Sequence, residues 1–236
     1  MKLIEVEIDS AWYEDKKVLS QITFQINHGE LVGVIGPNGA GKSTTIKTIL
    51  GLMNNWKGTI TFSNPASYSY VPERPIFYDE LTLQEHIDFI GAVEGIEESE
   101  LKKRADYLLQ KYKMEAHVHE LPATYSKGMQ QKAMLILALL TQPHLFIIDE
   151  PFIGLDPDAM KILLATIDAE RKRGAGILMS THVLDTAEKI CDRFLLIVKG
   201  RLVAQGTMEG IRKQAGLAYG SLYDCYHTIA EDKVYE

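Results

Sequence analysis

The chain has 236 residues, of which 46% are hydrophobic and 24% charged, proportions that fit one large globular α/β domain or two small ones and disfavour wholesale disorder. It carries 25 Lys and Arg against 32 Asp and Glu, a formal charge of −7, which disfavours a protein that holds nucleic acid through its overall field. Its two cysteines, Cys191 and Cys225, are too few for a disulfide scaffold, and no apolar run approaches the roughly 20 residues of a membrane helix.

The pattern of the first part of the chain predicts three strands, a loop and a helix. The opening stretch MKLIEVEIDS has acids where a signal peptide has an apolar core, and its LIEVEI run alternates as a strand does. A second alternating run, VLSQITFQI, follows a turn near Glu14–Lys17. The apolar run ELVGVIG then ends in a glycine-rich turn, and TTIKTILGLM has the spacing of a helix. We therefore expect a strand–loop–helix unit over residues 30–53.

The remainder of the chain alternates helices and strands. From Tyr70 onward helical patterns dominate, and after Leu145 apolar runs of strand length alternate with helical segments. Such alternation predicts a parallel sheet covered by helices. A hairpin turn is expected at Gly200–Arg201, and the chain beyond Gly210 has a helical pattern followed by a weakly patterned tail. The expected helices span residues 81–96, 98–112, 127–142, 158–173 and 183–191, and the expected strands 145–149, 176–180, 193–198 and 202–206.

Residues 36–43, Gly-Pro-Asn-Gly-Ala-Gly-Lys-Ser, complete the G-x-x-x-x-G-K-[ST] pattern of a phosphate-binding loop. Glycines let backbone N–H groups converge on a phosphate, and the following helix adds positive potential at its N-terminus. Lys42 is placed to reach the β- and γ-phosphates, and the Ser43 hydroxyl to ligate Mg²⁺. The alternative is a chance glycine-rich turn, but the flanking strand and helix favour nucleotide binding. The expected nucleotide-binding residues are Gly36, Asn38, Gly39, Ala40, Gly41, Lys42, Ser43 and Thr44.

A second candidate site is the acid pair that ends the apolar run LFIIDE. Because ligands of open α/β sheets bind at the carboxyl ends of the strands, Asp149 and Glu150 are expected at that edge. Asp149 suits the Mg²⁺ side of a nucleotide, and Glu150 is placed to polarise a water molecule as a general base. The alternative is a strand that simply ends in acids before Pro151, and the phosphate-binding loop makes this alternative weaker.

Five further segments carry residues in a characteristic order. They are Tyr13 ahead of Val18–Leu19, Tyr70–Glu73, Tyr125–Lys132, Gly154–Pro157 and Ser180–His182. Together with the phosphate-binding loop and the acid pair, they make the chain resemble the nucleotide-binding subunit of an ATP-binding cassette (ABC) transporter from about Leu3 to Gly210. The resemblance implies an α/β P-loop NTPase cassette over residues 1–210, with a RecA-like core, an N-terminal antiparallel β subdomain, a helical subdomain over about 74–140, and a short C-terminal tail over 211–236.

The resemblance assigns adenine contacts to Tyr13 and Val18, with the tyrosine ring stacking on the base. An ordinary strand-end tyrosine is the alternative, and the neighbouring Trp12 leaves the choice of ring open. Glu73 stands where most members of the family have a glutamine that offers its oxygen to Mg²⁺ or to a water on the metal. A loop glutamate in water is the alternative at this position.

The segment from Tyr125 to Lys132 resembles the family signature Leu-Ser-Gly-Gly-Gln, with Ser126 and Gly128 retained and Tyr125, Lys127 and Met129 altered. In the family this segment contacts the γ-phosphate of ATP bound to a second cassette, so Ser126, Lys127, Gly128 and Met129 join the expected nucleotide-binding residues. Ser126 is also a favoured helix N-cap, which is the alternative explanation.

Two further roles follow from the resemblance. Asp156 lies in the loop that meets the second cassette at the dimer seam, although Asp-Pro is also a common helix start. His182 matches the switch histidine that contacts the γ-phosphate and orients the attacking water, so the expected catalytic residues are Lys42, Glu150 and His182. The other histidines receive no role, and His117 and His119 are expected to be solvated.

The function implied is an ATP-binding and ATP-hydrolysing subunit that uses ATP and Mg²⁺ to drive transport by a separate transmembrane subunit. Two cassettes are expected to pair head to tail, as a homodimer or a heterodimer. The apolar segment Arg74–Tyr78 is expected to contact the membrane subunit, a core-facing loop being the alternative. The chain is expected in the cytoplasm, peripheral to the membrane through its partner.

Export is favoured over import, because the variants at Glu73 and Lys127 resemble export-type cassettes and few residues follow Gly206 to form a regulatory domain. Two alternatives stay open: a soluble ABC ATPase of translation or DNA repair, and a regulatory sensor that binds nucleotide and barely hydrolyses it. A single phosphate-binding loop, the absence of heptads between Lys42 and Asp149, and the negative charge disfavour the first. Glu150 and His182 disfavour the second.

Overall fold

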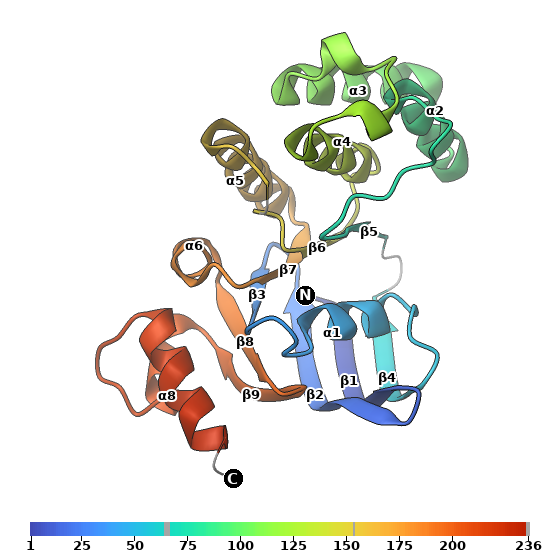
Figure 1. The fold of residues 1–236 in the computed structure, drawn as a ribbon. Coiled ribbons are helices and arrows are strands. Elements are labelled where there is room, and N and C mark those ends of the chain that lie inside the picture. The colour runs from blue at the N-terminus through green and yellow to red at the C-terminus, as the bar shows by residue number, and fades with distance from the viewer. Residues whose placement is uncertain (64–66, 153, 235–236) are drawn as a thin grey trace.

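The computed structural model describes residues 1–63, 67–152 and 154–234, which build one nine-stranded sheet with helices against it (Figure 1). The strand order across the sheet is β4-β1-β2-β9-β8-β3-β7-β6-β5. The strands are β1 Lys2–Tyr13, β2 Lys16–Asn27, β3 Leu31–Ile35, β4 Trp56–Phe62, β5 Tyr68–Val71, β6 Leu145–Asp149, β7 Gly176–Thr181, β8 Arg193–Val198 and β9 Arg201–Gly206. The helices are α1 Lys42–Ile49, α2 Leu83–Glu94, α3 Glu98–Tyr112, α4 Lys127–Leu140, α5 Pro157–Arg173, α6 Leu184–Ile190, α7 Met208–Gln214 and α8 Leu222–Val234, with short 3-10 turns η1 Glu115–His117 and η2 Pro122–Thr124.

One end of the sheet is antiparallel and consists of β4, β1 and β2. The alternating residues of β1 and β2, such as Val6 opposite Phe24, turn their apolar side chains to one face, so half of each strand is buried. This end joins the rest of the sheet through β2 and β9, where the ladder has a single pair, Ser20 with Arg201. Side-chain packing therefore contributes more than backbone pairing to that junction.

The central strands β3, β7 and β6 are parallel and buried along their whole length. Successive residues of these strands face different cores, since side chains alternate across a sheet. Phe146 and Ile148 pack with α4 and α5, whereas Leu145 and Ile147 pack with α1 and the antiparallel strands. Helices on both faces explain why the sequence of these strands is continuously apolar.

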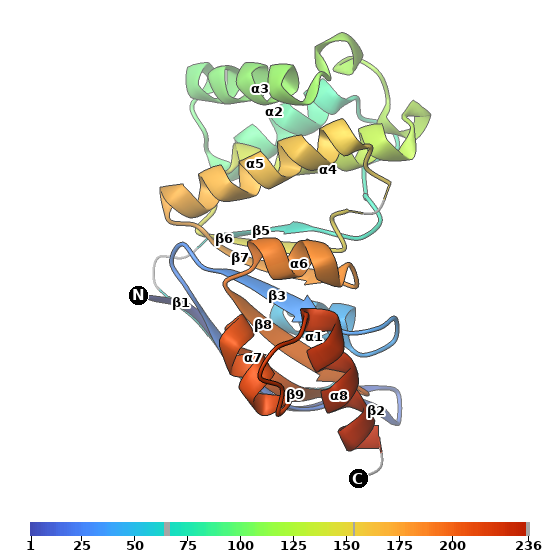
Figure 2. The same cartoon turned by 90° about the vertical axis from the view of Figure 1, so that its left-hand side faces the viewer.

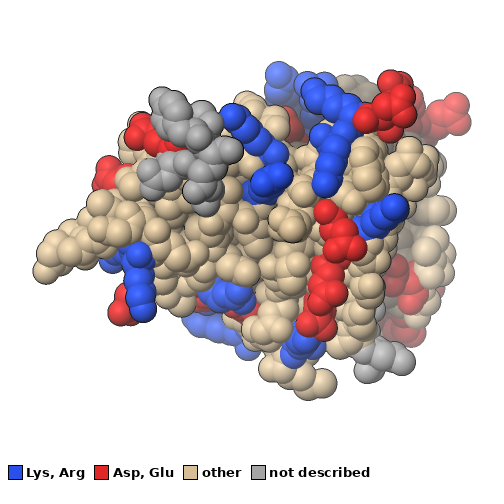
Figure 3. Space-filling view, turned by 90° about the horizontal axis from the view of Figure 1, so that it is seen from below, with Lys and Arg blue, Asp and Glu red and all other residues tan. Residues whose placement is uncertain are grey.

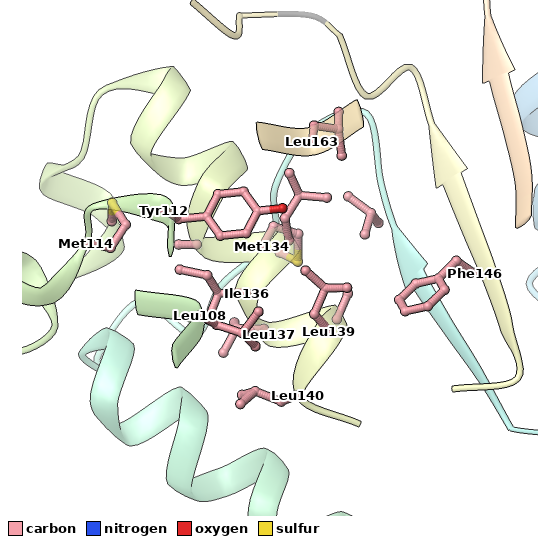
Figure 4. Packing of buried hydrophobic residues seen from close by; sticks show 14 of the residues in the cluster. Leu108, Tyr112, Met114, Met134, Ile136, Leu137, Leu139, Leu140, Phe146 and Leu163 are labelled. Carbon is pink, nitrogen blue, oxygen red and sulfur yellow. The ribbon is translucent and has the colours of Figure 1, made fainter. Parts of the chain in front are cut away.

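The helices α2, α3, α4 and α5 gather around one core, which they share with one face of strands β5, β6 and β7 (Figure 4). Tyr112 of α3 is fully buried there, and its hydroxyl donates a 3.1 Å hydrogen bond to Thr166 Oγ1 of α5. Burial raises the pKa of Tyr112 to about 12. At Gly91 of α2 an added Cβ would lie 2.2 Å from Leu101 Cδ2, so only glycine lets α2 and α3 approach this closely.

The C-terminal helices α7 and α8 pack beside β9 (Figure 2). Leu222, Cys225 and Ile229 of α8 are buried against residues of β8, which forms a third core. The weakly patterned tail of the sequence prediction therefore contains a packed helix. The expected cassette boundary at residue 210 falls inside α7, and residues 235–236 of the expected tail lie outside the described part of the chain.

The sequence prediction of an α/β cassette with parallel and antiparallel parts agrees with this architecture, but the strands β4 and β5 were not expected. None of the described helices has the length and apolar character needed to cross a membrane. On the face seen from below, Lys and Arg side chains lie among Asp and Glu (Figure 3). That face has no broad stretch of one charge sign.

Candidate functional site

The phosphate-binding loop lies between the buried strand β3 and helix α1, which begins at Lys42. Gly39 and Gly41 have φ angles of 79° and 113°, which only glycine adopts at low cost. A Cβ at Gly36 would lie 2.5 Å from the carbonyl oxygen of Ile197. The glycines of the motif are therefore required by backbone geometry and by the close approach of β8.

The Lys42 side chain is folded back over this loop and is only 4% exposed. Its Nζ donates hydrogen bonds to the carbonyl oxygens of Gly36 at 2.8 Å and Pro37 at 3.4 Å. It also lies 3.1 Å from Glu150 Oε1, so a carboxylate accompanies the buried ammonium group.

Asp149 and Glu150 lie at the carboxyl end of β6, beside the end of β7, as the sequence predicts. Asp149 is 2% exposed, and its Oδ1 accepts a hydrogen bond from the hydroxyl of Ser180. Glu150 is 5% exposed and has a φ of 51°, in the left-handed region that costs a non-glycine residue roughly 1–2 kcal/mol. Its backbone N–H donates to both the carbonyl oxygen and the hydroxyl of Ser180, each at 3.1 Å.

The Glu150 carboxylate links the phosphate-binding loop to His182. Its Oε2 accepts a 3.3 Å hydrogen bond from the His182 backbone N–H and lies 2.9 Å from the Nδ1 of that ring. Its Oε1 is buried and, among the described residues, accepts no hydrogen bond despite the nearby Lys42 ammonium. A buried oxygen without a hydrogen bond beside a cation is positioned for an additional donor, such as a water molecule.

A cavity of about 260 Å³ brings most of the phosphate-binding loop and Glu150 together, whereas the predicted residues Gly36, Ala40 and Asp149 do not line it. The phosphate-binding loop forms one wall, and Glu150, His182 and Glu73 line the rest. These residues are far apart in the sequence, so the fold confirms that they share one space. The roles assigned to them stay predictions. The lining residues are Pro37, Asn38, Gly39, Gly41, Lys42, Ser43, Thr44, Glu73, Glu150 and His182.

Tyr70 lies near two acidic residues of this site, Asp149 and Glu73. Burial raises the pKa of the Tyr70 hydroxyl to about 12, and the charges of Asp149 and Glu73 add to the shift. The tyrosine belongs to β5, whose residues pair with β6 in register, Tyr70 opposite Ile147. Its hydroxyl is therefore a neutral group near the two carboxylates.

The predicted signature residues do not line the cavity. Ser126 is the N-cap of α4, and its Oγ accepts a 3.3 Å hydrogen bond from the Met129 backbone N–H. Ser126 and Lys127 are exposed, and a Cβ at Gly128 would lie 3.2 Å from the carbonyl oxygen of Gly154. The structure thus confirms the capping role of Ser126 and leaves its contact with a nucleotide a prediction.

Asp156, predicted at a dimer seam, is the N-cap of α5. Its Oδ1 accepts a 2.7 Å hydrogen bond from the Ala159 backbone N–H, which lowers the pKa of this carboxyl. Asp156 lies outside the cavity, and its contact with a second chain stays a prediction.

Tyr13 and Val18, predicted at the adenine, also lie outside the cavity. Tyr13 ends β1 and is 45% exposed, and Val18 is half-buried. Trp12 instead lines a separate depression with Asn55 and Trp56. An exposed ring at Tyr13 is available for stacking.

Among the other histidines, His86 and His117 have partners that sequence reasoning missed. His86 is 4% exposed, and its Nε2 accepts a 3.0 Å hydrogen bond from the Tyr78 backbone N–H. His117 lies in a 3-10 turn with its Nδ1 3.1 Å from a carboxylate oxygen of Glu120, and 39% of its side chain is exposed, which agrees with the expected solvation. For His117 the H-x-x-E spacing to Glu120 was the available signal.

The metal-binding prediction fits the donors that are present. No three His, Cys, Asp or Glu side chains within residues 1–63, 67–152 and 154–234 gather to hold a metal by themselves. Ser43 and Asp149 supply a hydroxyl and a carboxylate, and Mg²⁺ typically takes one or two such protein ligands and completes its shell with phosphate oxygens and water. The donor set therefore suits a metal that arrives with a nucleotide.

Comparison with known proteins gives consistent results. A family model described as "ABC transporter" matches residues 19–153. The chain is 55% identical over 230 residues to the uncharacterized ABC transporter ATP-binding protein YthP of Bacillus subtilis, covering 97% of each chain. It is 41% identical to the ABC-type transporter ATP-binding protein EcsA of the same organism, covering 98% of each.

A solved structure described as an ATP-binding subunit of an ABC transporter superposes with a TM-score of 0.91 at 43% sequence identity. The alignment covers 96% of this chain and 99% of the other. Sequence and fold therefore match over almost the whole chain.

Proposed function

Because the chain belongs to the ABC transporter family, in which it is an ATP-binding subunit and an ATPase, we propose that it hydrolyses ATP at the cavity between the phosphate-binding loop and Glu150. The observation that carries this proposal is the convergence of Lys42, Glu150 and His182 on one cavity. A loop for phosphate, a cation and a buried carboxylate are the parts that phosphoryl transfer to water requires.

In this proposal the backbone of the phosphate-binding loop cradles the phosphates, and Lys42 exchanges Glu150 for a phosphate oxygen. Glu150 then accepts a proton from the attacking water, as a general base. His182 holds the Glu150 carboxylate and reaches the γ-phosphate through its ring. Phosphoryl transfer depends chiefly on positioning and charge neutralisation, and these three side chains supply a cation, a base and the group that holds the base.

We place Mg²⁺ at Ser43 and Asp149, with Glu73 as a third oxygen donor. When bound, the metal neutralises negative charge on the phosphates. Asp149 ends β6 and Ser43 lies at the start of α1 after β3, and the carboxyl ends of these parallel strands share one edge of the sheet.

We place adenine at Tyr13 and Val18, and a second cassette on the nucleotide through Ser126, Lys127, Gly128 and Met129. In one subunit these signature residues are outside the cavity, so a second chain, arranged head to tail, would supply them to the bound ATP. An exposed serine and a glycine at the start of α4 suit a phosphate because the helix N-terminus carries positive potential. Asp156 would lie at the seam between the two chains.

The membrane subunit is proposed to dock in a groove of about 470 Å³ between the segment after β5 and the helices α2 and α4. Phe77 is half-buried at its base, and Tyr78 and Phe89 are 59% and 45% exposed. Exposed aromatic side chains around an apolar groove suit a short helix of a partner. Through this contact the chain would lie on the cytoplasmic face of the membrane.

The docking proposal is tested by co-purification with the membrane subunit. Phe77→Ala and Tyr78→Ala should lose the partner, whereas Tyr107→Ala, an exposed tyrosine on α3, should retain it. Retention by the first two variants would contradict the docking site.

We propose export as the direction, on the resemblance of Glu73 and Lys127 to export-type cassettes. In vesicles whose cassettes face outward, an exporter accumulates its cargo when ATP is added outside, and an importer does not. The ATPase assignment itself is tested with the purified chain, with and without the membrane subunit. A sensor would bind ATP in both cases but would release phosphate in neither.

A further inference from the structure

Ser180, at the end of β7, contacts both acids of the nucleotide site. It lies opposite Asp149 in the parallel ladder and is completely buried. Its hydroxyl donates to Asp149 Oδ1 and accepts from the backbone N–H of Glu150 at 3.1 Å. One side chain therefore connects the expected metal ligand to the backbone of the expected general base.

We propose that Ser180 is a positioning residue for nucleotide hydrolysis, one that orients the Asp149 carboxylate toward the metal and holds the Glu150 backbone in its left-handed conformation. This inference rests on the proposed role of Asp149 in binding Mg²⁺. Neither Ser180 nor Asp149 lines the cavity, whereas Glu150 does, so Ser180 acts through its two neighbours and not on the substrate.

A hydroxyl is suited to this position because it donates one hydrogen bond and accepts others. Asp149 accepts only, when ionised, and the Glu150 N–H donates only, so a single hydroxyl satisfies both. Among the described residues no hydrogen bond is donated to Asp149 Oδ2, which leaves that oxygen available to a metal. Anchoring Oδ1 thus fixes the direction in which Oδ2 points.

The hydroxyl adds little to the pairing of the strands themselves. The backbones of β6 and β7 are already paired from Leu145 to Asp149, and the carbonyl oxygen of Ser180 accepts the Glu150 N–H at 3.1 Å. What the hydroxyl adds is an anchor for the Asp149 carboxylate and a second acceptor for the Glu150 N–H. Partners of metal-binding carboxylates typically change metal affinity or activity 10- to 100-fold when removed.

The test compares Ser180→Ala with the nearly isosteric pair Ser180→Thr and Ser180→Val. Threonine keeps the hydroxyl, and valine has a methyl group in its place. Thr166→Ala serves as a control, because it removes another buried hydroxyl far from the cavity. Binding of a fluorescent ATP analogue to the purified full chain is measured in EDTA and across a Mg²⁺ titration. The thermal midpoint of each variant is recorded alongside.

We expect Ser180→Ala and Ser180→Val to need about 10-fold or more Mg²⁺ for half-maximal tightening of nucleotide binding, with unchanged affinity in EDTA. Ser180→Thr should restore the wild-type requirement, and Thr166→Ala should change the thermal midpoint alone. Equal Mg²⁺ requirements in wild type, Ser180→Ala and Ser180→Val would overturn the proposal. So would a loss of affinity in EDTA that matches the loss in Mg²⁺, which would indicate a structural role.

The wild-type titration separates this inference from the proposed function. If Mg²⁺ does not tighten nucleotide binding to the wild-type chain, the assignment of Asp149 to the metal is wrong and the role of Ser180 falls with it. If Mg²⁺ tightens binding equally in wild type and in all Ser180 variants, the assignment of Asp149 stands and that of Ser180 alone is overturned.

Discussion

Replacing Glu150 with glutamine separates the two tasks that the structure gives this side chain. Its carboxylate is a proposed general base, and in the structure it is also the anion beside the Lys42 ammonium. Glutamine keeps the shape of the side chain and removes the charge. We expect ATP hydrolysis to fall while ATP binding tightens, and a closed dimer to accumulate.

The magnitudes follow from the geometry. At 3.1 Å and an effective dielectric constant near 20, the attraction between Lys42 and Glu150 is about 5 kcal/mol, and the desolvation of both groups offsets several kcal/mol of it. If Lys42 prefers Glu150 to water by a net amount of about 1.4 kcal/mol, the phosphate of ATP must overcome that preference in the wild type but not in Glu150→Gln. Removing it corresponds to roughly tenfold tighter ATP binding in the variant. Loss of a general base typically reduces the rate of the chemical step about 10²- to 10⁴-fold.

The assay measures phosphate release at saturating ATP and the dissociation constant for ATP under the same conditions. Size-exclusion chromatography with ATP reports the dimer. Glu30→Gln is the matched control, because Glu30 is a largely buried carboxylate paired with Arg193 outside the cavity. It should leave both the rate and the ATP affinity unchanged.

Two results would refute this reasoning. Wild-type turnover in Glu150→Gln would remove the residue from the chemistry. Weaker ATP binding in the variant would show that the carboxylate supports the nucleotide, directly or through its metal, and does not compete with it for Lys42.

Three further predictions test other parts of the site. Lys42→Ala should weaken ATP binding about 10- to 100-fold, because a charge-assisted hydrogen bond contributes roughly 1.5–3 kcal/mol; unchanged affinity by titration would count against the phosphate-binding loop. Ser126→Asp should keep the thermal stability of the wild type, since aspartate is an equally good N-cap, but should lose ATP-dependent dimerisation in light scattering; a normal dimer would restrict Ser126 to capping. Burial raises the pKa of Cys191 to about 12, so its alkylation in the folded chain should stay slow at pH 8 and rise steadily toward pH 10, and a plateau near pH 9 would contradict this environment.

The sequence predicts those elements whose local pattern agrees with their final environment. Helix α3 begins and ends where the periodicity indicates, because its apolar positions repeat regularly and Glu97 caps its first turn. The phosphate-binding loop is predictable for a similar reason, since its glycines, strand and helix are contiguous. Fold class and the main motifs could therefore be assigned without coordinates.

The missed elements have weak local patterns. Strand β4 is a largely exposed edge strand interrupted by Gly58, and β5 has four residues. Helix α8 has few strongly apolar positions, yet Leu222, Cys225 and Ile229 recur with helical spacing. Ser221 and Asp224 also form reciprocal hydrogen bonds of the kind seen in a capping box, a signal that was available before the structure.

The missed contacts of the site depend on how strands are paired. Asp149 meets Ser180 because β6 and β7 are in one particular register, and a shift of one residue would turn the serine to the other face. The contact between Lys42 and Glu150 depends on the path of a long side chain over the loop. Neither arrangement is encoded in the spacing of a motif.

The single-pair junction between β2 and β9 has a mechanical consequence. A ladder of many hydrogen bonds resists twisting, whereas apolar contact is non-directional and tolerates small rotations. The antiparallel end of the sheet, which carries Tyr13, is thus held to the part that carries Lys42 chiefly by the core that β1, β2 and α1 share. A molecule bound at both Tyr13 and Lys42 would add a second connection across this junction.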